Sequence, residues 1–203
     1  MIGAFLRGCI SIPLHWLSRV VLKVWGWKVL GTAPKEPKYI LLAAPHTSNW
    51  DAIVMLALAC YYRIRVYWMV KHSVFVGPFG WFLKAIGGVP INRRAAHGIV
   101  QQMIERFQQN ERYILLIPPE GTRSKAKYWK SGFYHIALGA DVPIVSGTMD
   151  WAKKESGLVD TCRLTGRVQD DMDHLRAIYS HISARYPQDY SPCRIREEDR
   201  TAS

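Results

Sequence analysis

Beyond residue 38 the chain alternates short apolar runs with segments of helical periodicity. Residues 39–44 and 113–117 are uninterrupted apolar runs, which predict strands buried on both faces of a sheet. Shorter strands are expected at 66–70, 89–91, 144–149 and, at an edge, 162–168. Helices are expected at 49–60, 79–86, 95–109, 132–140 and from about 170 to 182. This alternation predicts an α/β fold with a mixed, largely parallel sheet flanked by helices.

The first 30 residues do not follow this alternation. Residues 2–30 are expected to be apolar and helical, divided into two pieces at Pro13. Charged residues interrupt every apolar run before it reaches the roughly 18–20 residues of a spanning helix. No small-residue cleavage site follows, which argues against a cleaved signal. We therefore expect an N-terminal helical segment over 1–30 and one larger domain over 31–203.

This N-terminal segment has the pattern of a helix that lies in a membrane surface. His15, Arg19 and Lys23 share one narrow stripe of the helix, and apolar residues cover the rest. Cations at the level of the lipid headgroups and aliphatic side chains below them are typical of interfacial helices. The alternative is a helix that buries its apolar side on its own domain.

Positive charge is concentrated in the first half of the chain. The whole sequence has a formal net charge of +11, and residues 1–110 hold 13 basic and 3 acidic residues, a net of +10. The same half contains 6 of the 8 tryptophans. A basic, Trp-rich surface suits an anionic membrane or a nucleic acid, and the third alternative is an ordinary solvated face. No RNP, KH or zinc-finger pattern is present, so we expect no nucleic-acid partner.

Cysteines and glycine-rich motifs exclude several other classes. The 4 cysteines are widely spaced with no C-x-x-C pair, so we expect reduced thiols of a cytosol-facing protein and no metal site. No G-x-G-x-x-G or Walker loop is present, and no G-x-S-x-G elbow of a serine hydrolase.

Polar residues follow the first predicted strand of the sheet, where open α/β sheets bind their ligands. His46 is the first polar side chain after the apolar run, and Asp51 lies five residues further on. Asp51 can accept a hydrogen bond from one imidazole nitrogen while the other nitrogen takes a proton from a substrate hydroxyl. The alternative is a helix cap, because Ser48 and Asp51 have the spacing of a capping box.

Two further segments carry groups that suit a phosphate. Arg93 follows the predicted strand 89–91 and offers the planar fork that binds phosphate well. The segment 120–124 (Glu-Gly-Thr-Arg-Ser) follows the strand 113–117. There Glu120 can hold a hydroxyl, Gly121 permits close backbone approach, and Thr122 and Arg123 can hold a phosphate. Taken singly, each segment could equally be an ordinary surface loop.

In this order, the segments around His46, Arg93 and Glu120, with 142–145, resemble the four sequence blocks of the glycerolipid acyltransferases. Among these the chain is most similar to the 1-acylglycerol-3-phosphate O-acyltransferases (lysophosphatidate acyltransferases). The resemblance runs from about residue 39 to 149. It implies that the domain over 31–203 is catalytic and transfers a fatty acyl group to a lysophospholipid, giving phosphatidate. The donor would be an acyl thioester of acyl-carrier protein or coenzyme A, with no other cofactor.

The same resemblance implies roles for individual residues. His46 would be the general base and Asp51 the residue that orients it. Arg93 would bind the acceptor phosphate, with Lys71 as a second candidate. Glu120, Gly121, Thr122 and Arg123 would hold the glycerol and phosphate of the acceptor.

The resemblance also implies attachment to a membrane, which agrees with the pattern of residues 2–30. We expect a peripheral or monotopic protein on the cytoplasmic face of an anionic membrane. We further expect the excess cations to lie mainly on one face, around the mouth of the active site. Two alternatives stay open: an acyltransferase for another lysolipid or for glycerol phosphate, and a basic module that only binds nucleic acid or a membrane surface.

Overall fold

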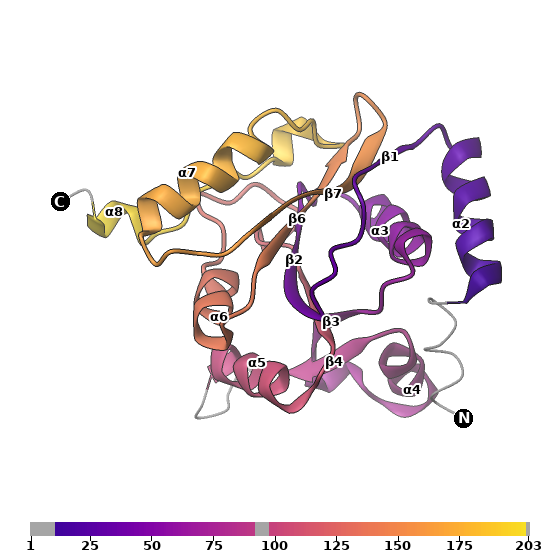
Figure 1. The fold of residues 1–203 in the computed structure, drawn as a ribbon, viewed down its shortest axis with the longest axis horizontal. Coiled ribbons are helices and arrows are strands. Elements are labelled where there is room, and N and C mark those ends of the chain that lie inside the picture. Colours follow the sequence, from indigo (N-terminus) through magenta and orange to yellow (C-terminus); the bar gives the residue numbers. More distant parts are fainter. Residues whose placement is uncertain (1–10, 92–97, 202–203) are drawn as a thin grey trace.

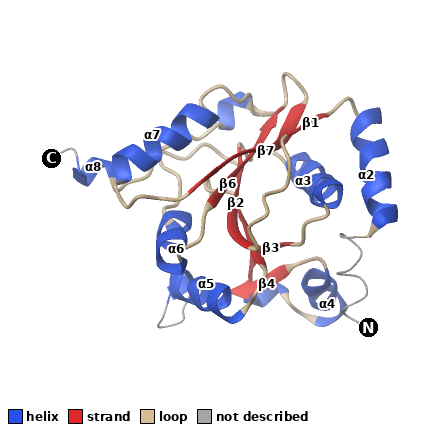
Figure 2. Cartoon of the chain, viewed as in Figure 1, coloured by secondary structure: helices blue, strands red, loops and turns tan. Residues whose placement is uncertain are grey.

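The computed structural model describes residues 11–91 and 98–201, which form a seven-stranded sheet with helices on both faces (Figures 1 and 2). The strands are β1 (Lys28–Leu30), β2 (Lys38–Ala44), β3 (Val66–Lys71), β4 (Gly88–Ile91), β5 (Tyr113–Ile117), β6 (Ile144–Asp150) and β7 (Glu155–Cys162). The helices are α2 (Ile12–Val24), α3 (Asn49–Tyr62), α4 (Gly77–Ala85), α5 (Gly98–Gln109), α6 (Gly132–Ala140), α7 (Val168–Tyr179) and α8 (Glu198–Thr201). Short 3₁₀ turns occupy His72–Val74 and Pro187–Asp189.

The strand order is β1-β7-β6-β2-β5-β3-β4. All neighbouring strands pair in parallel except β6 and β7, which are antiparallel. The predicted α/β fold, with a mixed and largely parallel sheet, is therefore confirmed. Because β2, β3, β4, β5 and β6 all run in one direction, their carboxyl ends lie at one edge of the sheet, which we call the carboxyl edge.

The central strand β2 explains why its sequence is apolar throughout. Ile40 and Leu42 point to one face of the sheet, and Tyr39 and Leu41 point to the other. None of the four is more than 4% exposed, because helices cover both faces. Residues from α5, α6 and α7 pack on the first face, and α3 packs on the second.

The predicted N-terminal helix is only partly correct. Within the described residues it spans Ile12–Val24, with Ser11 as its N-cap and Pro13 in its first turn. Residues 28–30 are not helical, because they form β1 and pair in parallel with β7. A strand of three residues is too short to show a periodicity in the sequence. No helix in the described part of the chain is both long and apolar enough to cross a membrane.

Helix α2 lies against α3 and buries only a narrow face (Figure 1). Ser18 and Leu22 are buried, and Leu22 packs in a cluster with Val54 and Leu58 of α3. Six other apolar side chains of α2 remain exposed by 41–83%: Ile12, Trp16, Leu17, Val20, Val21 and Val24. The alternative in which the helix packs on its own domain thus holds for the narrow face, whereas the placement of the wider, exposed face in a membrane surface stays a prediction.

The expected edge strand at 162–168 is wrong. The strand lies earlier, at Glu155–Cys162, and is not at an edge because β1 pairs with it on its outer side. Its first half includes Ser156 and Gly157, which do not predict a strand. Gly157 is required there, since a Cβ atom would lie 2.0 Å from the carbonyl oxygen of Leu30 on β1.

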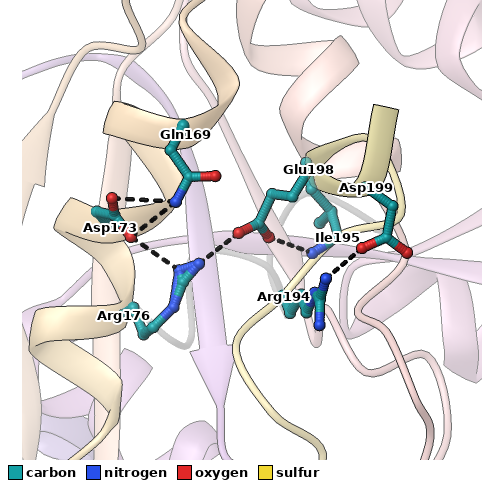
Figure 3. Close-up of polar contacts among 7 residues, drawn as sticks. All are labelled: Gln169, Asp173, Arg176, Arg194, Ile195, Glu198 and Asp199. Atoms are coloured by element: carbon teal, nitrogen blue, oxygen red, sulfur yellow. Dashed lines mark hydrogen bonds and ion pairs between the residues drawn. The ribbon is translucent and has the colours of Figure 1, made fainter. Parts of the chain in front are cut away.

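The polar C-terminal tail is folded onto the domain. Glu198 is 5% exposed, accepts a hydrogen bond of 2.8 Å from the backbone N–H of Ile195, and pairs with Arg176 of α7 (Figure 3). Ile195 is itself buried and forms a parallel bridge with Trp129. The tail therefore holds the loop between β5 and α6 in place.

Candidate active site

Several of the predicted site residues lie at the carboxyl edge of the sheet. His46 follows β2, Glu120 follows β5, and Lys71 ends β3. β2 and β5 are neighbours in the sheet, so their two loops are adjacent. This is the edge at which open α/β sheets bind ligands, as the sequence predicts.

His46 and Asp51 face each other. The Nδ1 atom of His46 lies 3.4 Å from the Oδ2 atom of Asp51. The imidazole is 22% exposed, whereas the carboxylate is 1% exposed. Because Nδ1 is turned toward Asp51, the Nε2 atom is left to receive a proton from a bound molecule. The geometry is that of a base with its orienting carboxylate.

Asp51 accepts more hydrogen bonds than the sequence suggests. The backbone N–H groups of Thr47 and Ser48 donate to its Oδ2 atom, each at 2.8 Å. The hydroxyl of Ser48 donates to Oδ1 at 2.9 Å, and the indole N–H of Trp151 donates to Oδ1 at 2.8 Å. Burial alone would raise the pKa of Asp51, but the hydrogen bonds, including that from His46, lower it below its ordinary value. Asp51 is therefore an ionised partner for His46.

The capping interpretation of Asp51 and the catalytic one are compatible. Asp51 lies in the first turn of α3, and Ser48 is the N-cap of that helix. The bond from the Ser48 N–H to the Asp51 carboxylate is the half of a capping box that fixes a side chain at the third helical position. The cap thus holds the carboxylate in the place where His46 meets it.

The buried carboxylate of Glu120 contacts the backbone of His46. Its side chain is 1% exposed, and its Oε1 atom accepts a hydrogen bond of 3.0 Å from the backbone N–H of His46. Its Oε2 atom is buried without a hydrogen-bond partner among the described residues. Burial raises the pKa of Glu120 to about 7, and the hydrogen bond from His46 opposes that rise. Glu120 therefore supports the loop that carries the base, and its contact with an acceptor stays a prediction.

The rest of the 120–124 loop is exposed. Gly121 has a φ of +66°, and a Cβ atom there would lie 2.9 Å from the Lys130 side chain, so only glycine fits without adjustment. Thr122 and Arg123 are exposed, and Arg123 donates a hydrogen bond to the side-chain oxygen of Asn49. The loop thus brings the predicted phosphate-binding Arg123 to the first turn of α3, next to the His46 loop.

Two further predicted phosphate ligands are Lys71 and Arg93. Lys71 is exposed at the end of β3, which is separated from β2 by β5. Arg93 lies outside the described residues. The phosphate-binding roles of both residues stay predictions.

Trp151 is the contact with Asp51 that the sequence analysis missed. It directly follows β6 at the carboxyl edge, a position that could have drawn attention to it. Its ring packs edge-to-face against Trp27, with 5.0 Å between ring centres, and the Lys154 ammonium lies 4.4 Å from its centre. These contacts hold the indole so that its N–H reaches Asp51.

The expected gathering of cations around the site is wrong for the described residues. Lys38 begins β2, Arg65 precedes β3, and Arg63 caps the end of α3. All three lie at the edge of the sheet opposite to His46. Only part of the excess charge of the first half, such as Lys71, lies at the carboxyl edge.

Two other features lie outside the site. Asp160, Cys162 and His174 have potential metal-ligand atoms within 4.8 Å of one another. Since Cys162 pairs with Ile144 at the start of β6, this group lies at the edge opposite to His46. An apolar cavity of about 30 Å³ lies between β2, α3, β6 and β7.

Comparisons with known proteins bear on the family and the fold. A family model described as Acyltransferase matches residues 28–150. The chain is similar to the crystal structure of the 1-acyl-sn-glycerophosphate (LPA) acyltransferase PlsC from Thermotoga maritima, with 18% identity and a TM-score of 0.56. The alignment covers 83% of this chain and 76% of that chain, and at this identity the likeness shows the fold. No curated protein matches the chain.

Proposed function

The chain belongs to the acyltransferase family, and on that basis we propose that it esterifies a lysophospholipid. The acyl group comes from the thioester of acyl-carrier protein or coenzyme A, and the acceptor is 1-acylglycerol-3-phosphate, so that the product is phosphatidate. The observation that carries the proposal is the His46–Asp51 pair, with 3.4 Å between Nδ1 and Oδ2, at the carboxyl edge of the sheet. No other cofactor is needed for this reaction.

In the proposed reaction His46 acts as general base. Its Nε2 atom takes the proton of the acceptor hydroxyl as the hydroxyl oxygen attacks the thioester carbonyl carbon. The carboxylate of Asp51 stabilises the imidazolium that forms. When the carbon–sulfur bond breaks, the imidazolium returns the proton to the leaving thiolate. Ester and free thiol are the products, and no covalent enzyme intermediate is required.

A membrane surface is the proposed place of action. Exposed apolar residues of α2 and α4 form what we call the apolar face: Ile12, Trp16, Leu17, Val20, Val21, Val24, Phe79, Trp81 and Phe82. Figure 1 shows α2 and α4 on the same side of the sheet. A groove of about 370 Å³ beside α2 is lined by Arg19 and Lys23 together with Trp16. This mixture of apolar rings and cations supports peripheral or monotopic attachment to the cytoplasmic face of an anionic membrane.

The proposal is tested by mass spectrometry of the lipids formed from a mixed lysolipid panel. Wild-type protein is incubated with acyl-coenzyme A or acyl-carrier protein, and we expect phosphatidate as the main new lipid. Loss of positioned base catalysis in His46→Ala lowers the rate on the order of 10²–10⁴-fold. The variant should unfold at the wild-type temperature, because the imidazole is only partly buried. Near-normal turnover by folded His46→Ala, or acylation of a phosphate-free acceptor in preference, would contradict the proposal.

A further inference from the structure

Two arginines from distant parts of the chain reach the first turn of α3. Arg123 donates a hydrogen bond to the side-chain oxygen of Asn49. The guanidinium carbon of Arg185 lies 5.4 Å from the ring centre of Trp50. Asn49 and Trp50 are the first two residues of α3 and directly follow the His46 loop. The two guanidinium groups therefore contact adjacent residues of one helical turn, three and four positions after the candidate base in the chain.

Arg185 is held by aromatic rings and not by a carboxylate. Its guanidinium carbon lies 4.5 Å from the ring centre of Trp151 and 5.7 Å from that of Tyr186. Across residues 11–91 and 98–201, Arg185 forms no ion pair. Its Nε–H contacts the Tyr186 hydroxyl at 3.5 Å, which leaves the two terminal nitrogens as donors. A guanidinium in this state is prepared to bind an anion.

The backbone around Arg185 is fastened to both sides of the site. The N–H of Trp151 donates to the carbonyl oxygen of Ser183 at 2.9 Å. The N–H of Tyr186 donates to the hydroxyl oxygen of Thr47 at 3.2 Å. Between them Ala184 is 6% exposed. Arg185 is therefore set in position by the two loops that carry Asp51 and its indole donor.

We propose that Arg185, together with Arg123, binds a phosphate group of a substrate beside His46. This inference rests on the proposed function, in which both substrates carry phosphate: the acceptor in its headgroup and the donor in its phosphopantetheine arm. The dispersed charge and planar fork of arginine suit phosphate, and two such groups on one helical turn suit a phosphate better than a single cation would. Arg185 lies in a segment to which neither the sequence blocks nor the family match extends.

The test is a binding titration without turnover. Dissociation constants are measured calorimetrically for a short-chain lysophosphatidate, for the monoacylglycerol that lacks its phosphate, and for coenzyme A. The variants are Arg185→Gln and Arg185→Lys, and the matched control is Arg112→Gln, an exposed cation that precedes β5 at the opposite edge of the sheet. Circular dichroism establishes that each variant is folded.

We expect Arg185→Gln to raise the dissociation constant of one phosphate-bearing ligand by about tenfold or more, as loss of a charge-assisted hydrogen bond predicts. Whether lysophosphatidate or coenzyme A is weakened identifies the source of the phosphate. Arg185→Lys should retain part of the binding, and Arg112→Gln should retain all of it.

The inference is overturned if Arg185→Gln leaves the dissociation constants of lysophosphatidate and coenzyme A unchanged, or if it weakens the binding of monoacylglycerol equally. It is also overturned if Arg112→Gln weakens binding as much as Arg185→Gln does, or if neither phosphate-bearing ligand binds to the wild-type protein. If Arg185→Gln loses binding to anionic vesicles while the dissociation constants of both ligands stay unchanged, Arg185 acts at the membrane surface instead. Failure of the proposed function looks different, because wild type would then bind lysophosphatidate through Arg185 without acylating it.

Discussion

The two loops that form the site differ in how firmly they are held. The His46 loop is fixed by the carboxylate of Asp51, which is 1% exposed and receives hydrogen bonds from Thr47, Ser48 and Trp151. In the 120–124 loop, Thr122 and Arg123 are exposed, and among the described residues Arg123 has a single side-chain hydrogen bond, to Asn49. The group proposed to transfer the proton is thus preorganised, while the group proposed to hold the substrate phosphate can adjust to it.

The sharpest way to break this contrast is to exchange Asp51 for asparagine. Asp51→Asn removes the charge and turns an amide N–H₂ toward groups that are themselves donors. We expect a loss of about 2–3 kcal/mol in unfolding free energy and a rate reduced on the order of 10²–10⁴-fold. Urea denaturation and a thioester-release assay measure the two effects.

Arg123→Ala is the matched substitution in the other loop. Because Arg123 is exposed, the unfolding free energy of the variant should stay within about 0.5 kcal/mol of the wild-type value, while its KM for the acceptor rises. Equal destabilisation by both substitutions would remove the difference between the loops.

The second prediction concerns the indole donor. Trp151→Phe keeps an aromatic ring but removes the indole N–H that bonds to Asp51, so the pKa of Asp51 rises and its carboxylate takes up a proton at a higher pH. We expect a several-fold fall in kcat/KM, as the loss of about 1 kcal/mol implies, and an acidic limb of the pH–rate profile displaced to higher pH. If kcat/KM falls by the same factor at every pH, so that the acidic limb of the pH–rate profile does not move, Trp151 acts only through packing.

The fourth substitution concerns the titration of Glu120. Its pKa is about 7 in the folded protein and has an ordinary value of 4.5. The folded state therefore binds more protons than the unfolded state between these values, so this group's stabilisation is complete below about pH 4.5 and is lost as the pH rises through about 7. Glu120→Gln keeps the acceptor for the His46 N–H and removes the titration. Its melting temperature relative to wild type should rise from about pH 5 to about pH 8, whereas parallel curves would refute the assigned burial effect.

Local patterns were sufficient to predict much of the fold and the centre of the site. The apolar run of β2 marks a strand covered on both faces, and the polar residues after it mark the carboxyl edge. His46 and Asp51 are close in sequence, so their contact depends on a single loop and helix start. This is why a short motif is enough to predict it.

The parts that could not be predicted depend on contacts between distant segments. Trp151 reaches Asp51 across 100 positions of the chain. Arg185 reaches Trp50 from a segment that follows the helix predicted at about 170 to 182. The strand β1 has three residues and exists because β7 offers it a partner. No periodicity or spacing records such pairings, so a single sequence does not indicate them.

The packing of Trp27 on Trp151 bears on how the protein can be handled. The N-terminal segment is a natural candidate for deletion when a more tractable soluble form is wanted. Removing it would strip away Leu22 and Trp27, expose the indole of Trp151 and release its hold on Asp51. A shortened enzyme would then lose rate even on dissolved substrates, where no bilayer is involved. Its poor performance should not be taken as a measure of how much the reaction depends on lipid.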